Sequence, residues 1–248
     1  MRWRLLPTSE GDARWNMALD EAVSEAVSDG VSPPSLRLYR WRPSAVSIGY
    51  FQSLEREVDV EACRRDGVDF VRRRTGGGAV YHDSEGEVTY SVAAPLDVYP
   101  EDLTESYRAI CGRVVDALAR LGIDAEFTPI NDVVVDGRKI SGNAQTRRMD
   151  VLLQHGTVLH DVDPERMFTY LMPDVDKVSD KHVSDVRERV TSVSREADVG
   201  VDDTARALRE AFTEGRDWFE GEPSEREVRR AEELSEERYG SREWNEMK

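Results

Sequence analysis

The chain has 248 residues, which is enough for one sizeable core and a small second domain. Its 50 Asp and Glu residues exceed its 34 Lys and Arg residues, and the formal net charge of -16 argues against a general nucleic-acid-binding protein and against binding to anionic membranes. No apolar stretch is long enough to span a membrane, and the N-terminus lacks the apolar core of a signal peptide, so the sequence predicts a cytoplasmic protein.

Lysine is scarce in this sequence, because nearly all of the basic residues are arginine. Together with the abundant carboxylates, this composition is typical of an acidic, halophilic-type protein, whose surface repulsion is screened in a salt-rich cytoplasm. The lysines are Lys139, Lys177, Lys181 and Lys248.

The first hundred residues are predicted to contain two helices and four strands. Apolar residues at helical spacing indicate the helices, and alternation of apolar with polar residues indicates the strands. We expect helices over 16–28, with Asn16 as the N-cap, and over 58–65, and strands over 35–41, 45–50, 69–73 and 88–92.

The rest of the chain adds a long helix, a hairpin and several shorter helices. Apolar residues from Leu103 to Leu121 follow one helix face, which Gly122 ends, and Asp136-Gly137 between two strand-like segments is a strong signal for a two-residue hairpin. We further expect a strand over 151–160 that Gly156 interrupts, and helices over 164–171, 203–214 and 223–239. The last helix has few large apolar residues, so we expect it to be weakly anchored or to form a partner-binding surface.

This mixture lacks a regular alternation of strands and helices. It therefore predicts an α+β fold with a mixed, largely antiparallel sheet flanked by helices. We expect a single domain over residues 1–220, followed by a charged, helical C-terminal extension over 221–248.

The segment Arg72–Asp83 carries the clearest chemical signal. Its three glycines, Gly76, Gly77 and Gly78, permit a backbone that brings N–H groups close to a bulky anion, and the preceding arginines supply paired donors for phosphate oxygens. The same residues also fit a glycine-rich turn between strands with solvated arginines. The segment matches neither the Walker pattern nor the dinucleotide fingerprint.

A second segment, Asn131–Gln145, contains Lys139, one of the few lysines, which indicates that a compact ammonium is required there. The alternative is a surface lysine beside the hairpin. Asn131 and Asp132 could bind ribose, an amine or a metal ion, or could equally cap the start of a strand.

A third segment, Gln154–Leu159, places His155 on an apolar strand, where a histidine is more often a hydrogen-bonded core residue than a ligand. The four histidines lack the short spacings of a zinc site, so the sequence assigns no metal ligands.

These three segments, in this order, resemble the lipoate-protein ligase family, within the superfamily that includes biotin-protein ligases and octanoyltransferases. The resemblance extends from about Trp15 to Ser194, and residues 36–41, 47–52 and 181–191 support it. It implies a fold related to the catalytic domain of class II aminoacyl-tRNA and biotin synthetases.

The resemblance also implies an ATP-dependent reaction in two steps. ATP, with Mg2+, would activate lipoate as lipoyl-AMP, and a lysine amine on a lipoyl domain would then attack this mixed anhydride. Lys139 would bridge the α-phosphate and the acyl oxygens and so stabilise the charge that grows there. The other predicted contacts with nucleotide and acyl group are Arg73, Gly76, Gly77, Gly78, Ala79, Val80, Tyr81, His82, Asn131, Asp132, Gly142, Asn143, Ala144 and His155.

Two departures from the family pattern bear on this prediction. The related octanoyltransferases acylate a cysteine, whereas 125–130 contains none, and Cys63 and Cys111 lie outside the matching segments. Many ligases continue into a small accessory domain, and the sequence from Tyr239 resembles only its beginning. We therefore expect a separate accessory protein or a different mode of action.

The expected partners are lipoyl domains of 2-oxoacid dehydrogenase complexes and the glycine cleavage H protein, and neither nucleic acid nor membrane. Two alternatives remain open at this point. One is an octanoyl- or lipoyltransferase that uses an acyl carrier donor, and the other is a non-catalytic lipoate-binding subunit. A DNA-binding regulator is disfavoured, because no helix-turn-helix precedes Trp15 and the charge is acidic.

Overall fold

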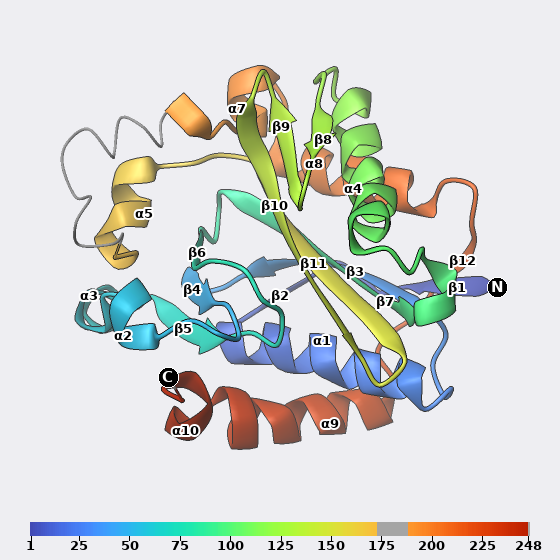
Figure 1. The fold of residues 1–248 in the computed structure, drawn as a ribbon, viewed down its shortest axis with the longest axis horizontal. Coiled ribbons are helices and arrows are strands. Elements are labelled where there is room, and N and C mark those ends of the chain that lie inside the picture. The colour runs from blue at the N-terminus through green and yellow to red at the C-terminus, as the bar shows by residue number, and fades with distance from the viewer. Residues whose placement is uncertain (173–187, 248) are drawn as a thin grey trace.

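A computed structural model describes residues 1–172 and 188–247. A nine-stranded sheet runs through the middle of the molecule in the order β12-β1-β3-β7-β11-β10-β9-β8, with β2 paired to β3 (Figure 1). From β3 through β8 neighbouring strands are antiparallel, whereas β1, β2 and β12 join in parallel, which confirms the predicted mixed, largely antiparallel sheet. The strands are β1 (Arg2–Leu5), β2 (Ser9–Gly11), β3 (Ser35–Trp41), β7 (Glu87–Pro95), β8 (Glu126–Thr128), β9 (Asp132–Val135), β10 (Arg138–Arg148), β11 (Val151–Leu159) and β12 (Asp217–Glu220).

A second, three-stranded sheet lies beside it in the order β5-β4-β6, with a small apolar core of its own. The glycine-rich segment 73–79 connects its two outer strands, so the glycines lie between strands as the sequence predicts, but the strand that follows them is β6 and not the expected strand over 88–92. Its elements are β4 (Ala45–Ile48), β5 (Asp69–Arg72) and β6 (Val80–His82), with the short helices α2 (Leu54–Glu57), α3 (Val60–Asp66) and α5 (Pro164–Tyr170).

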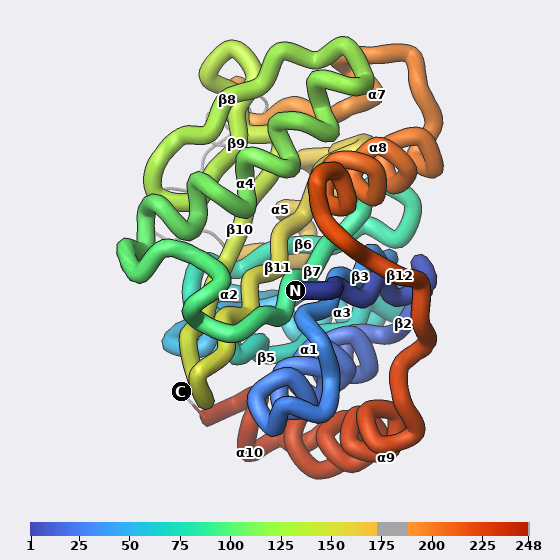
Figure 2. The backbone as a smooth tube through the Cα atoms, turned by 90° about the vertical axis from the view of Figure 1, so that its right-hand side faces the viewer, coloured from blue at the N-terminus to red at the C-terminus, as the bar shows by residue number. Residues whose placement is uncertain are grey.

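Helices cover both faces of the large sheet (Figures 1 and 2). One face carries α4 (Leu103–Arg120) and α8 (Val201–Thr213), and the other carries α1 (Ala13–Ser28), against which α9 (Glu225–Leu234) packs. Within residues 1–172 and 188–247, no helix is long and apolar enough to cross a membrane. The remaining short elements are η1 (Leu96–Val98), α7 (Val193–Glu196), η3 (Ser235–Tyr239) and α10 (Arg242–Asn245).

The predicted hairpin is confirmed, but two local predictions are wrong. Asp136 and Gly137 have φ of 49° and 73°, the left-handed pair that a tight hairpin turn needs. The N-cap of α1 is Asp12, and Asn16 lies inside the helix, where its side chain donates to the carbonyl oxygens of Gly11 and Arg40. Strand β11 continues through Gly156, because the ladders to both neighbouring strands remain in register there.

The C-terminal helix is anchored more firmly than its sequence indicates. Arg4 and Glu227 form a buried ion pair, with 2.6 Å between Arg4 Nη2 and Glu227 Oε1. Ala231, Leu234 and Tyr239 are buried in the same core cluster as α1. Two apolar residues of α9, Ala231 and Leu234, thus pack in the cluster around α1, and the buried Arg4–Glu227 pair adds a second anchor for the helix.

This pair predicts a large effect on stability. Glu227→Ala should lower the free energy of unfolding by roughly 3–5 kcal/mol, because it leaves the Arg4 charge buried without its carboxylate. Urea unfolding measures the loss, and Glu225→Ala, at an exposed position in the same helix turn, is the matched control. Equal losses for both variants would contradict the assigned role of the pair.

Candidate functional site

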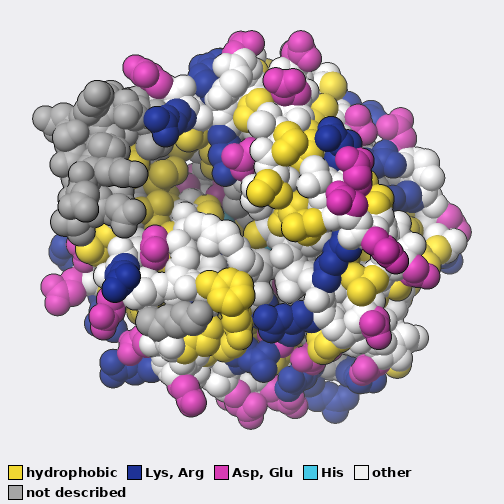
Figure 3. All heavy atoms as spheres, viewed as in Figure 1, with side chains coloured by type: hydrophobic (Ala, Val, Ile, Leu, Met, Phe, Trp, Pro, Cys, Tyr) yellow, Lys and Arg dark blue, Asp and Glu magenta, His cyan; other side chains and the backbone are white. Residues whose placement is uncertain are grey.

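A pocket of about 150 Å³ lies where the two sheets meet. Strands β10 and β11 form one side, and β4, β6 and the glycine-rich segment form the other. Figure 3, a view from the same side as Figure 1, shows a hollow near the middle of the molecular surface with apolar side chains around it. The lining residues are Met17, Tyr39, Trp41, Ser47, Arg73, Gly77, Gly78, Ala79, Val80, His82, Thr89, Asn131, Lys139, Gly142, Asn143, Ala144, His155, Gly156 and Thr157.

All three predicted segments reach this pocket, so residues far apart in the sequence meet there. Gly76, Tyr81 and Asp132 are the predicted contacts that do not line it. The Tyr81 ring stacks instead on Tyr170, with 5.2 Å between ring centroids. Supporting residues 181–187 lie outside the described part of the chain, and the roles of all these side chains toward a ligand stay predictions.

Arg73 holds the glycine-rich segment in place from within. Its guanidinium is buried and donates to the carbonyl oxygens of Ser47, Gly76 and Gly78, at 2.7–3.0 Å. Burial lowers the pKa of Arg73 to about 10. In this structure the group therefore shapes the pocket wall, and its donors are occupied by the protein.

The two neighbouring arginines are also engaged within the protein. Arg72 donates to the carbonyl oxygens of Gly49 and Tyr50, and Arg74 pairs with the buried Glu21 carboxylate at 2.6 Å. A Cβ atom at Gly49 would overlap the carbonyl oxygen of Gly77, so a glycine is needed where these two loops touch. The three arginines thus hold the loop and its neighbours together.

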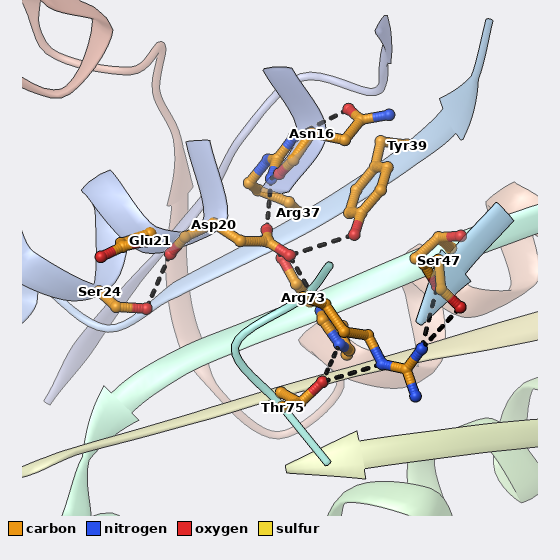
Figure 4. A network of polar contacts seen from close by, with 12 residues as sticks. Asn16, Asp20, Glu21, Ser24, Arg37, Tyr39, Ser47, Arg73 and Thr75 are labelled. Atoms are coloured by element: carbon orange, nitrogen blue, oxygen red, sulfur yellow. Dashed lines mark hydrogen bonds and ion pairs between the residues drawn. The ribbon is translucent and has the colours of Figure 1, made fainter. Parts of the chain in front are cut away.

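His155 belongs to a buried polar network that joins α1 to the glycine-rich segment. Figure 4 shows two members of this network, Asp20 on α1 and Thr75 in the glycine-rich segment. Nδ1 of His155 lies 3.2 Å from Asp20 Oδ2, and its Nε2 lies 2.8 Å from Thr75 Oγ1. Asp20 also pairs with Arg37 and accepts a hydrogen bond from Tyr39 at 3.1 Å. Burial alone raises the pKa of Asp20, but Arg37 and His155 hold it below its usual range.

Burial lowers the pKa of His155, although the neighbouring Asp20 carboxylate acts in the opposite direction. The neutral imidazole donates from Nδ1 to Asp20, which leaves Nε2 to accept from the Thr75 hydroxyl. The sequence allowed either a core histidine or a ligand. The structure shows both features, since His155 is hydrogen-bonded in the core and also borders the pocket.

Lys139 projects its ammonium to the mouth of the pocket. Lys139 Nζ lies 2.7 Å from Asp132 Oδ1, and the side chain is 41% exposed. It crosses over Gly142, where a Cβ atom would lie 2.7 Å from Lys139 Cε. The absence of a side chain at Gly142 therefore leaves space for the Lys139 side chain in this conformation.

Asn131 and Asn143 form a reciprocal pair that fixes the wall opposite the glycine-rich segment. Each side-chain amide donates to the carbonyl oxygen of the other residue. Asn143 Oδ1 also accepts from the hydroxyl of Tyr90, and a Cβ atom at Gly156 would overlap this amide. Gly156 therefore provides space for Asn143 and does not interrupt the strand.

Neither a metal site nor a reactive thiol is present in the described part of the chain. No three His, Cys, Asp or Glu side chains there are grouped to hold a metal ion. Cys63 and Cys111 are buried away from the pocket lining, and burial raises the pKa of each thiol to about 12, which disfavours thiolate chemistry.

Sequence reasoning missed several lining residues, above all Trp41, Ser47 and Thr89. Their strands show only the hydrophobic pattern of a core, so nothing local separates a pocket residue from a core residue. The signal that could have found them is polar residues at buried positions: Ser47 and Thr89 are each 2% exposed.

Residues 12–213 match the family model described as the lipoyl protein ligase A/B catalytic domain. The octanoyltransferase LipM of Kyrpidia tusciae is 42% identical, with 98% of each chain covered. The octanoyltransferase LipM of Bacillus subtilis is 33% identical, with 98% of this chain and 97% of that protein covered.

Two solved structures are similar over nearly the whole chain. One is described as a bi-partite lipoate protein ligase, with its E2 lipoyl domain, from Thermoplasma acidophilum; it is 36% identical with a TM-score of 0.90 and covers 99% of this chain and 96% of that one. Another, lipoate-protein ligase A bound with ATP, is 35% identical with a TM-score of 0.84 and covers 99% and 98%.

The curated relatives correct the main functional prediction. They are octanoyltransferases, so the predicted ATP-dependent lipoate-protein ligase is wrong, and the alternative of an acyl-carrier-dependent transferase agrees with them better. The error arose because the segments around Lys139 and the glycines are common to ligases and transferases and do not specify how the acyl group is activated.

The lowered pKa of His155 predicts a pH-dependent stability. Between the lowered folded-state pKa and the ordinary value of about 6.5, the unfolded chain binds more protons than the folded one, so the free energy of unfolding should fall as the pH falls through this window. His155→Gln should weaken this dependence. Urea unfolding at several pH values tests it, and an unchanged pH slope in the variant would contradict it.

Proposed function

Because the chain belongs to the lipoyl protein ligase A/B catalytic-domain family, we propose that it is an acyltransferase that moves an octanoyl or lipoyl group from an acyl carrier thioester to a lysine of a lipoyl domain. The observation that carries the proposal is its similarity to octanoyltransferases along 98% of its length. The reaction replaces a thioester by an amide.

The pocket chemistry supports acyl transfer. Ala79, Val80, Ala144 and the glycines provide an apolar wall with little side-chain bulk, which suits a linear acyl chain. Lys139 supplies an ammonium at the mouth. When an amine or hydroxyl attacks a thioester, negative charge develops on the carbonyl oxygen, and a fixed cation beside that oxygen lowers the barrier.

A carrier thioester is already activated for attack by a nucleophile. In this proposal neither the ATP nor the Mg2+ that the resemblance implied takes part in transfer, and the acyl group arrives bound to its carrier rather than as free lipoate. Lys139 then acts on the acyl carbonyl alone. Its ion pair with Asp132 holds the ammonium at a lining position of the pocket.

One of the similar solved structures supports a lipoyl domain as the acceptor. The Thermoplasma acidophilum structure described above belongs to a lipoylation system that comprises a bi-partite lipoate protein ligase and its E2 lipoyl domain, and it covers 99% of this chain. The proposed acceptors remain the lipoyl domains of 2-oxoacid dehydrogenase complexes and the glycine cleavage H protein, and we place the reaction in the cytoplasm.

The direct test supplies purified protein with an octanoylated acyl carrier protein and a lipoyl domain, without ATP, and follows the mass of the lipoyl domain. The proposal predicts a single octanoyl addition on its lysine. A second reaction supplies free octanoate or lipoate with ATP and Mg2+. Modification only in this second reaction would overturn the proposal.

Substitution of Lys139 tests its assigned role. Lys139→Met should lower kcat/KM for octanoyl transfer by about 10²-fold or more, because the developing charge on the carbonyl oxygen loses its cation. Single-turnover assays measure the effect. Arg206→Met, on the exposed face of α8, removes one positive charge away from the pocket and should change the rate less than about twofold.

A further inference from the structure

The residues that line the pocket bear on whether the proposed reaction has an enzyme-bound intermediate. The acyl group of a thioester can pass directly to an amine, or it can first form a covalent intermediate with the enzyme. Neither cysteine lines the pocket, and both thiols are buried with raised pKa values, so a cysteine intermediate has no support. An oxygen nucleophile in the pocket is the remaining intermediate to consider.

Ser47 offers such a hydroxyl. It lies on β4 and lines the pocket, and its Oγ is 2.7 Å from Nε2 of His82, which also lines the pocket. On the other side of the imidazole, His82 Nδ1 lies 2.8 Å from Glu87 Oε1. A hydroxyl, an imidazole and a carboxylate are thus connected in the order that nucleophilic catalysis uses.

The geometry matches the proton positions that this chemistry needs. Glu87 Oε1 is an acceptor for a proton on Nδ1 of His82, and in that tautomer Nε2 accepts from the Ser47 hydroxyl. Ser47 Oγ in turn accepts a hydrogen bond from Arg73 Nη1 at 3.1 Å. This guanidinium stabilises negative charge on Oγ, and Figure 4 shows Arg73 directed at Ser47.

The imidazole and the carboxylate are held rigidly. The His82 ring stacks on Trp41, with 3.9 Å between centroids and 13° between planes. Thr89 donates to Glu87 Oε1 at 2.8 Å and accepts from Trp41 Nε1 at 2.8 Å. Glu87 Oε2 is buried without a hydrogen-bond partner in the described structure. The hydrogen bonds to this carboxylate therefore all reach Oε1, from His82 and Thr89.

A second group with the same chemistry serves as an internal comparison. Thr75, His155 and Asp20 are connected in the same order, but the Thr75 hydroxyl does not line the pocket. Asp20 is also already paired with Arg37. Of these two groups, only the Ser47 group combines a hydroxyl that lines the pocket with a carboxylate that has no arginine partner in the described structure and is hydrogen-bonded to its histidine.

We propose that Ser47 accepts the acyl group from the donor as an ester and passes it to the lysine of the lipoyl domain, with His82 carrying the proton and Glu87 positioning His82. This inference rests on the proposed function and adds the intermediate to it.

The chemistry balances in two displacements. Ser47 Oγ attacks the thioester carbonyl carbon as its proton passes to His82 Nε2; the C–S bond then breaks, and the donor sulfur leaves as a thiol with that proton. The neutral lysine amine next attacks the ester carbon and gives a proton to His82 Nε2. The C–O bond breaks, the proton returns to Ser47 Oγ, and an amide remains.

The experiment incubates the protein with octanoylated acyl carrier protein without acceptor and locates the added mass by peptide mass spectrometry. We expect one octanoyl ester on Ser47. Ser47→Ala should lose it and slow transfer by roughly 10³-fold or more. Ser47→Cys should restore labelling as a hydroxylamine-sensitive thioester, and Glu87→Gln should lower kcat with little change in KM for the donor.

Ser44→Ala is the matched control, because Ser44 also lies beside the start of the small sheet but does not line the pocket. It should label and transfer like the wild type. Thermal unfolding establishes that each variant folds. Wild-type transfer rates in folded Ser47→Ala, or a label at another residue, would overturn the role of Ser47.

A probe that needs no carrier separates this inference from the proposed function. An alkyl fluorophosphonate reacts with activated serines, and we expect it to label Ser47 in the wild type and in Ser44→Ala. Label at Ser47 without any carrier-dependent transfer would support the nucleophile and overturn the proposed donor. Carrier-dependent transfer with neither label nor sensitivity to Ser47→Ala would do the reverse.

Discussion

The arrangement of the pocket depends on one buried cation, Arg73, which has no carboxylate partner among the described residues 1–172 and 188–247. Arg73 is 5% exposed and distributes its donors over three carbonyl oxygens and two hydroxyl groups. A buried guanidinium is costly unless its donors are satisfied, so the backbone around it must present carbonyls from several directions. The glycine-rich segment does this, and Gly77, with a φ of 94°, takes a conformation that other residues rarely adopt.

Both polar networks of the pocket converge on this guanidinium. On one side Thr75 connects it to His155 and Asp20, and on the other side Ser47 connects it to His82 and Glu87. The first network ties the glycine-rich segment to α1 and the large sheet, and the second ties the small sheet to β7. These two networks therefore fix the pocket between the two sheets.

The sequence predicted the fold well because its signals are local. Asp136-Gly137 specifies its turn through left-handed dihedrals, and the apolar face from Leu103 to Leu121 specifies α4. The start of α1 was misplaced because Asp12 and Asn16 are both capable caps, and only the fold shows that Asn16 donates to the end of β2 and to β3.

The site was predictable only where its residues cluster in short segments. The glycines, Lys139 and His155 could be found in this way, whereas Ser47 and Glu87 could not, since their partners are set by strand pairing. The arginines illustrate the limit most clearly. Their charge suggested contacts with an anion, but in the structure the buried Arg73 donates to backbone carbonyl oxygens and holds the glycine-rich segment, which no sequence pattern reveals. The activation chemistry of the acyl group was mispredicted because it is not encoded in these shared segments.

Hydrogen–deuterium exchange of the segment 73–80 in the wild type and in Arg73→Lys tests the central claim most directly. A lysine keeps the charge but cannot donate to several acceptors in a planar array. The account predicts slow exchange in the wild type and markedly faster exchange of this segment in the variant, with α4 unchanged as the internal reference. Equal protection of the segment in both proteins would show that Arg73 does not hold the pocket wall.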